Sequence, residues 1–228
     1  MSDRARESTR AAEPTGFLYP FIDAEERDAG SLLAELAGSA RRKIAESQAV
    51  RRDALRACAA MIDAAATAMC SSFLAGGRLF TFGNGGSATD ARLVTSRFLD
   101  PPSGRALPSI CLDDDRAVIT ALANDVGFDV VFARQLRAHA RRGDIALGLS
   151  TSGGSANVLE AFAAAHDIGL TTVGLAGYDG GSMAVSGHVE HCLVVRSDSV
   201  HRIQEAQDAL VSELWTQVQR RLDQVDPR

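Results

Sequence analysis

The sequence has little of several features that mark particular protein classes. Aromatic residues make up only 5% of the chain, which leaves few rings to stack on nucleic-acid bases. The net charge is −5 at pH 7, so no basic surplus is available to bind a phosphate backbone. The four cysteines are widely spaced without a Cys-x-x-Cys pair, which indicates core thiols rather than disulfides or a zinc knot. Nucleic-acid binding and a disulfide-stapled secreted domain are therefore both disfavoured.

Signals for secretion and for a membrane are also missing. The sequence shows no signal-peptide core and no apolar run that we expect to cross a bilayer. A length of 228 residues with 46% hydrophobic content suits one α/β domain with an extension. We therefore expect a soluble, cytoplasmic protein.

Two loops rich in glycine and serine are the most informative segments present. They cover 83–87 and 150–155, and each joins a short aliphatic or β-branched run to a helical pattern. Such a turn binds anions, because the N–H groups of the first helical turn lack partners and the helix dipole adds positive potential. Neither loop has the Lys-Ser/Thr of a triphosphate-binding loop, and the first is not Gly-x-Gly-x-x-Gly. The loops therefore predict a sugar phosphate whose single phosphate is held by hydroxyl groups.

The chain is predicted to have three parts. Residues 1–30 form a partly disordered arm, whose apolar cluster 17–22 packs on this chain or on a neighbouring subunit. Residues 31–75 carry apolar positions at helical spacing and predict a pair of Ala-rich helices, with surplus apolar surface for oligomerisation. Residues 76–224 alternate strands with helices, which is typical of a parallel sheet covered on both faces.

The predicted elements of the third part place both loops at one edge of the sheet. Ligands of such sheets bind beyond the carboxyl ends of the strands, where both loops lie. We expect strands near 78–82, 108–112, 145–149, 170–175 and 190–195, and helices near 88–98, 115–122, 128–140, 156–167, 180–187 and 201–222.

Five motifs occur in order along these elements. They are Gly83-Asn84-Gly85-Gly86-Ser87 with Asp90-Ala91, Ala123-Asn124-Asp125 with Gly127-Phe128, Ser150-Thr151-Ser152-Gly153 with Ser155-Ala156-Asn157-Val158, Asp179-Gly180-Gly181, and Arg202-Ile203-Gln204-Glu205. With these motifs the chain resembles the sugar isomerase (SIS) family, and within it the phosphoheptose (sedoheptulose 7-phosphate) isomerases, over about residues 50–220. The resemblance implies a three-layer α/β/α sandwich with a flavodoxin-like five-stranded parallel sheet and N-terminal helices. It also implies a homotetramer with active sites between subunits.

The resemblance further implies a phosphate site built from hydroxyl groups. Ser155 can act both as a ligand and as a helix N-cap, which is the commoner role of a serine in a turn. The matching residues are Ser87, Ser150, Thr151, Ser152 and Ser155 for the phosphate, Asn84 and Asp125 for the sugar, and Gln204 on the last helix.

The family's metal site does not carry over. In the family, a His and a Glu on one helix and a Gln and a His on the last helix bind the metal, and the Glu transfers the proton. The matching residues here are Leu93, Arg97, Gln204 and Ser212. Leucine neither binds a metal nor accepts a proton, and arginine stays protonated. We therefore predict no metal and no cofactor.

The base for an aldose–ketose isomerisation must then come from elsewhere, because a proton has to move between adjacent carbons. The candidate catalytic residues are His201 and Glu205, with Asp208 and Glu213 as further candidates. A helix face turned to solvent or to another subunit accounts for all four better than catalysis does.

Three functions remain on this basis. The missing ligands favour a non-catalytic protein that binds a sugar phosphate and has a regulatory role, without turnover of sedoheptulose 7-phosphate and with a protein partner left open. The alternative is an isomerase for a heptose or related ketose phosphate with a rearranged active site. A transcription regulator ranks last, because no helix-turn-helix with a basic face is found.

Overall fold

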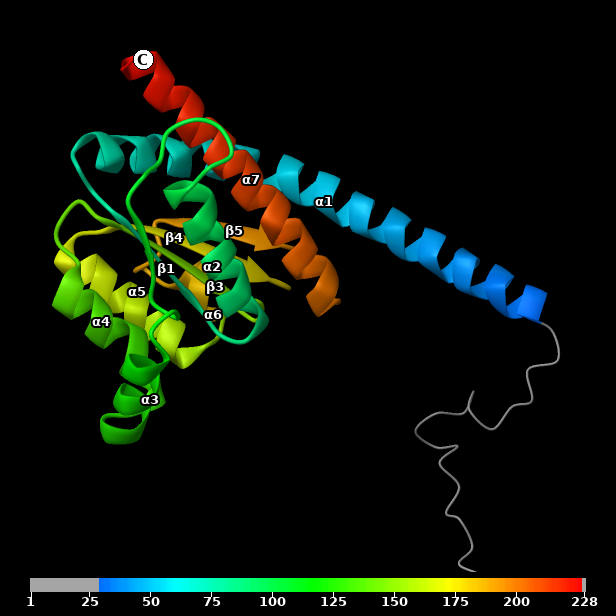
Figure 1. Ribbon diagram of the computed structural model, residues 1–228, viewed down its shortest axis with the longest axis horizontal. Coiled ribbons are helices and arrows are strands. Elements are labelled where there is room, and N and C mark those ends of the chain that lie inside the picture. Colours follow the sequence, from blue (N-terminus) through cyan, green and yellow to red (C-terminus); the bar gives the residue numbers. More distant parts are fainter. Residues whose placement is uncertain (1–28, 227–228) are drawn as a thin grey trace, which may run out of the picture. The chain divides into compact units, whose positions relative to one another are not determined.

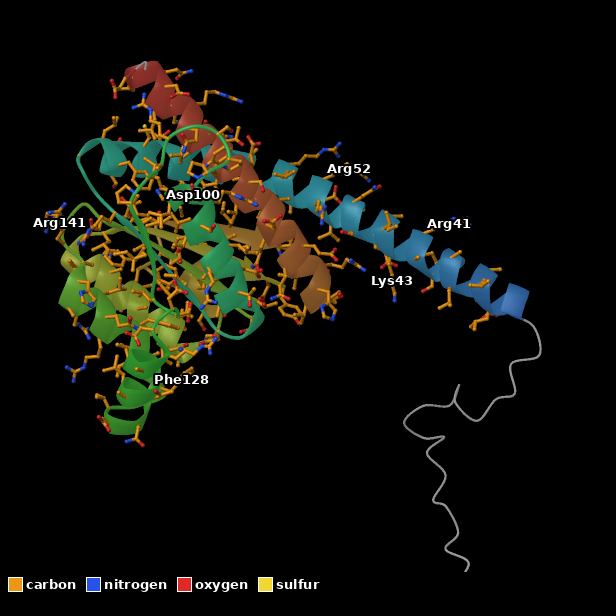
Figure 2. The ribbon with its side chains drawn as sticks, in the orientation of Figure 1. Arg41, Lys43, Arg52, Asp100, Phe128 and Arg141 are labelled. Atoms are coloured by element: carbon orange, nitrogen blue, oxygen red, sulfur yellow. The ribbon has the colours of Figure 1, made fainter. Side chains whose placement is uncertain are left out.

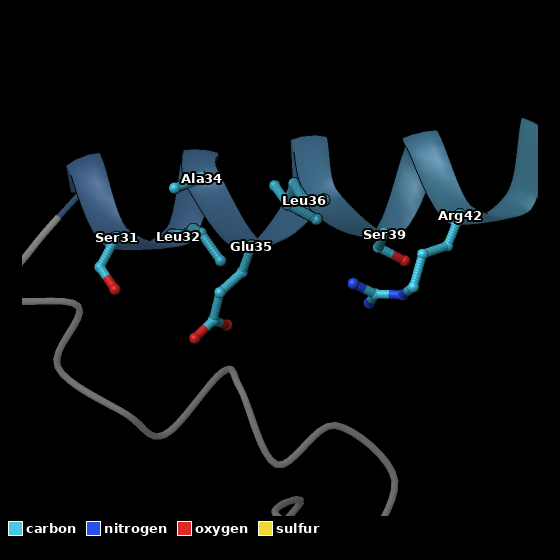
Figure 3. A pocket seen from close by; sticks show the side chains of 8 residues that line it. Ser31, Leu32, Ala34, Glu35, Leu36, Ser39 and Arg42 are labelled. Atoms are coloured by element: carbon cyan, nitrogen blue, oxygen red, sulfur yellow. The ribbon is translucent and has the colours of Figure 1, made fainter.

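The computed structural model describes residues 29–226 of the chain. The chain divides into two units between residues 43 and 44, and the larger one, Ile44–Arg228, holds the sheet (Figure 1). The described part of the smaller unit is the start of a helix. Leu32, Glu35 and Arg42 are among the side chains that line a pocket along it (Figure 3). The apolar cluster 17–22 lies outside the described residues.

Five parallel strands form one sheet in the larger unit, in the order β2-β1-β3-β4-β5. Their bounds are β1 (Leu79–Gly83), β2 (Ser109–Cys111), β3 (Ile145–Ser150), β4 (Thr171–Gly177) and β5 (His191–Val195). The central strands β1 and β3 are buried along their whole length, as expected for strands covered on both faces. This strand order is the flavodoxin-like one, so the predicted fold class is confirmed.

Helices cover both faces of the sheet (Figure 1). The helices are α1 (Ala29–Leu74), α2 (Gly86–Leu99), α3 (Arg116–Asp125), α4 (Val131–His139), α5 (Ala156–Ile168), α6 (Gly181–Val185) and α7 (Val200–Val225), with a 3₁₀ turn at Phe128–Val130. The C-terminal part of α1, with α2 and α7, buries one apolar core against the sheet. Helices α4 and α5 bury a second core, in which the ring of Phe82 lies 5.5 Å from that of Phe132 and 5.3 Å from that of Phe162.

Residues 29–74 form one continuous helix, where the sequence analysis predicts two. No proline interrupts this stretch, and most of its residues are strong helix formers such as Ala, Leu, Arg and Glu. Nothing local therefore breaks the helix until Gly76, whose φ of +80° is the left-handed conformation that ends helices. The helical spacing of the apolar residues was predicted correctly, but the sequence holds no signal for the turn expected between two helices.

Within residues 29–226, α1 is also long and apolar enough to cross a membrane by length and composition alone, which the sequence analysis did not predict. Core helices of soluble domains meet the same criteria. Here Ile62, Ala66 and Met69 are fully buried in the core shared with the sheet. Packing in the domain therefore accounts for the apolar residues in the C-terminal part of this helix.

The four cysteines are free thiols, as predicted. Cys58, Cys70 and Cys111 are buried in the core, and Cys192 is half-buried. Burial raises the pKa of Cys111 and of Cys192 to about 11, so both thiols stay protonated near neutral pH. They serve as small apolar core residues.

Candidate functional site

The two Gly/Ser loops lie side by side at the carboxyl edge of the sheet. Strand β1 ends at Gly83 and β3 at Ser150, and the two strands are hydrogen-bonded neighbours. The helices that follow, α2 and α5, begin within a few residues of these strand ends. Two helix N-termini therefore flank one place beyond the sheet, which is a favourable arrangement for an anion.

A cavity of about 240 Å³ lies between these loops. It brings together six residues that the sequence analysis selected, and adds three that it did not. The lining residues are Asn84, Ser87, Ser150, Thr151, Ser152 and Ser155, with Leu149, Tyr178 and Val200. Six of the nine lining residues carry a hydroxyl group, so the cavity suits a phosphoryl group and the carbons next to it.

Hydroxyl groups in the second loop face one another instead of capping the helix. The Oγ atoms of Ser150 and Ser155 are 2.9 Å apart. Ser155 occupies the N-cap position of α5, yet its side chain makes no capping hydrogen bond. The Ser152 Oγ accepts a hydrogen bond from the Gly154 N–H at 3.2 Å, which fixes it within the turn. The cap interpretation of Ser155 therefore does not describe this structure, and its hydroxyl remains at the cavity.

An asparagine pair ties the first loop to α5. The Asn84 Nδ2 donates to the Asn157 Oδ1 at 2.8 Å, and the Asn157 Nδ2 donates back to the Asn84 Oδ1 at 2.9 Å. Asn157 is only 2% exposed, so the pair is fixed from the buried side. The sequence analysis selected Asn84 as a sugar contact, but did not assign a role to Asn157.

Tyr178 is the unpredicted residue with the most unusual backbone. Its φ of +53° makes it the single non-glycine residue with positive φ between residues 29 and 226. It directly follows β4 and lines the cavity. A bulky residue in this strained conformation is often found at functional sites. Its neighbours Asp179-Gly180-Gly181 marked the turn in the sequence, but not the strain at Tyr178.

Asp125 lies apart from this cavity in the described chain. It is exposed at the end of α3 and accepts a hydrogen bond from the Asn124 Nδ2 at 2.8 Å. Phe128, from the same motif, is also exposed, at 52% (Figure 2). Asp125 does not line this cavity, and its contact with a sugar stays a prediction.

A second group of polar side chains lies where α2 and α7 pack against each other. The Arg97 Nη1 donates to the Ser212 Oγ at 2.6 Å, and the Arg97 Nη2 donates to the Asp208 Oδ1 at 3.1 Å. Nearer the start of α2, the Gln204 Nε2 donates to the Asp90 Oδ2 at 3.4 Å. We call this group the α2–α7 seam.

The seam adjoins the hydroxyl-lined cavity. A small hollow of about 10 Å³, enough for one water molecule, lies at the seam. Asp90, Arg97 and Asp208 line it together with Leu149, which also lines the larger cavity. The two spaces therefore have Leu149 as a common lining residue.

Comparison with known proteins decides the family. A model described as the SIS domain matches residues 44–177. The chain belongs to the SIS domain family. Phosphoheptose isomerase from Roseiflexus sp. (strain RS-1) is 42% identical over 158 residues, which are 68% of this chain and 79% of that protein. The phosphoheptose isomerase of Geobacter sp. (strain M21) is 40% identical over 163 residues, covering 71% and 84%.

Solved structures agree with this SIS assignment. Phosphoheptose isomerase from Neisseria gonorrhoeae has a TM-score of 0.74 and 34% identity, covering 80% of this chain and 98% of that one. The enzyme from Francisella tularensis has a TM-score of 0.75 and 32% identity, covering 81% and 98%. The resemblance to the phosphoheptose isomerase group is therefore confirmed.

These relatives contradict the prediction of a non-catalytic SIS protein. Proteins about 40% identical over most of the chain are named isomerases, which favours the alternative prediction, an isomerase with a rearranged site. The prediction equated the loss of metal ligands with the loss of the reaction. A proton transfer between carbons needs a base and a group that stabilises charge on oxygen, and neither role is limited to one residue type.

The residues at the family's metal positions do not fit a metal ion in this SIS chain. Arg97 carries a permanent positive charge and donates to Ser212, and Gln204 donates to Asp90. Leu93 is 56% exposed and has no ligand atom. In the part of the chain that the structure describes, no group of three or more His, Cys, Asp or Glu side chains is placed to hold a metal.

Neither predicted base lines the cavity of the SIS domain. The Glu205 carboxylate accepts hydrogen bonds from the Ser47 Oγ and from the Arg202 guanidinium, and these bonds lower its pKa. His201 is exposed in the first turn of α7. Both remain predictions, with geometry that ties Glu205 to α1 rather than to the cavity.

Asp90 is a carboxylate in a different electrostatic environment. Burial raises its pKa, the nearby Asp208 carboxylate raises it further, and the hydrogen bond from Gln204 opposes both. A carboxylate with a raised pKa holds a proton more readily and is a stronger base. The sequence analysis noted Asp90 as part of a motif without assigning it chemistry.

Asp113 supports the first loop from the neighbouring strand. It follows β2, and its Oδ2 accepts a hydrogen bond from the Gly83 N–H at 3.2 Å. Burial raises the pKa of Asp113 to about 6, although the hydrogen bonds from Gly83 and Cys111 act in the opposite direction. Its position just past a strand at the carboxyl edge was the available signal, and the sequence analysis did not use it.

Proposed function

We propose that this protein is an aldose–ketose isomerase for a sugar phosphate, of the phosphoheptose isomerase type. The observation that carries the proposal is the hydroxyl-lined cavity at the converging N-termini of α2 and α5, in a chain about 40% identical to phosphoheptose isomerases. The cavity supplies the phosphate site, and the adjoining seam supplies charged groups for the chemistry. A soluble protein of the cytoplasm fits this activity.

The phosphate binds through dipoles and hydroxyl groups. The first turns of α2 and α5 offer unpaired N–H groups and positive potential. In this proposal the Ser150–Ser155 pair separates, so that each hydroxyl donates to a phosphate oxygen. The proposed phosphate ligands are Ser87, Ser150, Thr151, Ser152 and Ser155, and the proposed sugar contacts are Asn84, Asp125 and Gln204.

The reaction moves one proton between two carbons. A base takes the proton from C1 of the ketose, and the electron pair of the C–H bond forms the C1=C2 double bond of an enediolate with its charge on O2. Return of the proton to C2, with the O1 hydroxyl proton transferred to O2 directly or through solvent, yields the aldose. We propose Asp90 as the base, because it lines the hollow that adjoins the cavity. His201 and Glu205 are the other candidates.

We also propose that the active protein is a homotetramer. The start of α1 carries exposed leucines, with Leu32 at 39%, Leu33 at 66% and Leu36 at 57% exposure. Neighbouring apolar side chains with this exposure are suited to contact another subunit.

Turnover is tested by NMR of sedoheptulose 7-phosphate in deuterated buffer. We expect aldose to form with deuterium at C2, because the proton passes through a base that exchanges with solvent. The matched control is the double variant Ser150→Ala/Ser152→Ala, which should bind and convert the sugar phosphate poorly. Sugar phosphate that binds by calorimetry, but neither reacts nor exchanges, contradicts the proposed function.

A further inference from the structure

Arg97 is held in a fixed orientation at the α2–α7 seam. Its two terminal nitrogens donate to different residues of α7, Ser212 at 2.6 Å and Asp208 at 3.1 Å. Its side chain is still 29% exposed, so a small molecule can reach it. A guanidinium has five N–H donors, and two bonds to α7 leave donors free for a ligand.

Arg97 lies farther along α2 than Ser87, which lines the phosphate cavity. Ser87 at the phosphate cavity and Arg97 are ten residues apart, which is about 15 Å along a helix axis. Side chains on a helix tend to lean toward its N-terminus, and Arg97 lines the hollow at the seam, which shares Leu149 with the phosphate cavity. In a heptose 7-phosphate, C1 and C2 lie at the opposite end from the phosphate.

We propose that the Arg97 guanidinium, positioned by Asp208 and Ser212, stabilises the enediolate oxygen in place of a metal ion. This inference rests on the proposed isomerase function. The charge that develops on O2 as the C1 proton leaves is met by a cation that is already oriented. Arginine suits this task because its planar donors bind two oxygens at once and it never loses its charge.

The same arrangement explains why the residues around Arg97 differ from a metal-binding set. A metal ion at this position would face the permanent positive charge of Arg97, which repels it strongly at short distance. Leu93 adds no ligand, and the Ser212 hydroxyl is already bonded to Arg97. Arg97 therefore supplies the positive charge that a metal ion would otherwise bring to this position.

A purely structural role of the Arg97–Asp208 ion pair predicts different effects of substitution. An exposed Arg–Asp pair contributes little to stability and nothing to the reaction. Asp208 is 57% exposed, so the pair on its own is worth little to the fold. Effects on kcat with normal folding and normal phosphate affinity then separate the two roles.

The first experiment measures kcat, KM and thermal unfolding of Arg97→Gln and Arg97→Lys with sedoheptulose 7-phosphate. Loss of one pre-oriented donor to an oxyanion costs about 10²–10³-fold in kcat, and we expect this loss for Arg97→Gln. Arg97→Lys keeps the charge without the fork and should recover part of it. Inorganic phosphate should bind both variants as it binds the wild type. An unchanged kcat in Arg97→Gln overturns the proposal.

The second experiment asks about metal directly. Wild-type protein treated with a chelator should retain its activity and contain no stoichiometric zinc by mass spectrometry. The triple variant Leu93→His/Arg97→Glu/Ser212→His restores the ligand types implied by the family and should bind one zinc ion by calorimetry. Activity that disappears on chelation and returns with zinc overturns the role of Arg97. A wild type inactive toward sugar phosphates overturns the proposed function itself, and so the two failures are distinguishable.

Discussion

At the scale of single residues, the base of the reaction is the sharpest question. Asp90 and Glu205 are both carboxylates, but their surroundings act in opposite directions on the pKa. Burial raises that of Asp90, and hydrogen bonds from Ser47 and Arg202 lower that of Glu205. Environment rather than residue type therefore distinguishes the two candidates.

Asp90→Asn is expected to lower kcat by about 10²–10⁴-fold, the usual contribution of a positioned base. The variant keeps the size of the side chain, and its amide still reaches Gln204, so the fold should be unaffected. Deuterium incorporation into the sugar phosphate gives the readout. Glu205→Gln and His201→Gln serve as matched controls that should retain most activity. The assignment of Asp90 fails if one of these controls loses activity while Asp90→Asn keeps it.

Ser150→Ala and Ser152→Ala are each expected to weaken binding of the sugar phosphate by at least about tenfold. A hydrogen bond to a charged group contributes roughly 1.5–3 kcal/mol, and both hydroxyls line the cavity. Titration calorimetry measures the affinity. Ser71→Ala, on the exposed side of α1, is a control that removes a hydroxyl bonded only to the Thr67 carbonyl. Unchanged affinity in the Ser150/Ser152 double variant would remove the phosphate site from this loop.

Residue by residue, the sequence allowed the hydroxyl groups to be predicted, but not their partners. Ser150 and Ser155 lie in one turn, so local sequence was enough to place them together. Asn157, Tyr178 and Arg97 acquire their roles from contacts across the fold or from backbone strain, which no local pattern encodes. Identifying them required the packing of α2, α5 and α7.

At the scale of elements, the turn after β2 supports the loop after β1. The Gly83 N–H donates to the Asp113 carboxylate, so the ionisation of Asp113 after β2 affects the loop after β1. The strand and helix positions were predictable because alternation of apolar runs with Gly/Ser turns is a local signal. The α2–α7 seam was not predictable, since it depends on how two distant helices align.

The stability of the fold should depend on pH through Asp113. Its pKa is raised to about 6 in the folded state from an ordinary value of 3.8. The folded chain therefore binds the proton more tightly, so this contribution is fully present below about pH 4 and is lost as pH rises through about 6. Asp113→Asn mimics the neutral form. The stability of the variant relative to wild type should therefore be greater at pH 7.5 than at pH 4.5. Urea unfolding at both pH values measures this difference. An equal effect of the substitution at both pH values contradicts it.

At the scale of the whole molecule, the fold followed from the order of elements, and the two-helix prediction shows where that reasoning stops. Periodicity reports which face of a helix is apolar, but it does not report an interruption that local sequence leaves unmarked. The oligomeric state has to be inferred separately from the fold. Apolar residues at the start of α1 are explained neither by the sheet nor by the core of the larger unit. Leu32, Leu33 and Leu36 remain exposed in the single chain.

We therefore expect wild-type protein to have a mass about four times the 24.1 kDa of one chain in light scattering at micromolar concentration. The double variant Leu32→Glu/Leu36→Glu places charges in the proposed contact and should shift the mass toward smaller species, because buried unpaired charges are costly. Helicity should stay the same, since glutamate is a good helix former. Arg41→Glu is the control that changes charge on the same helix without removing an apolar side chain. A monomeric wild type, or a double variant of unchanged mass, would show that these leucines do not hold subunits together.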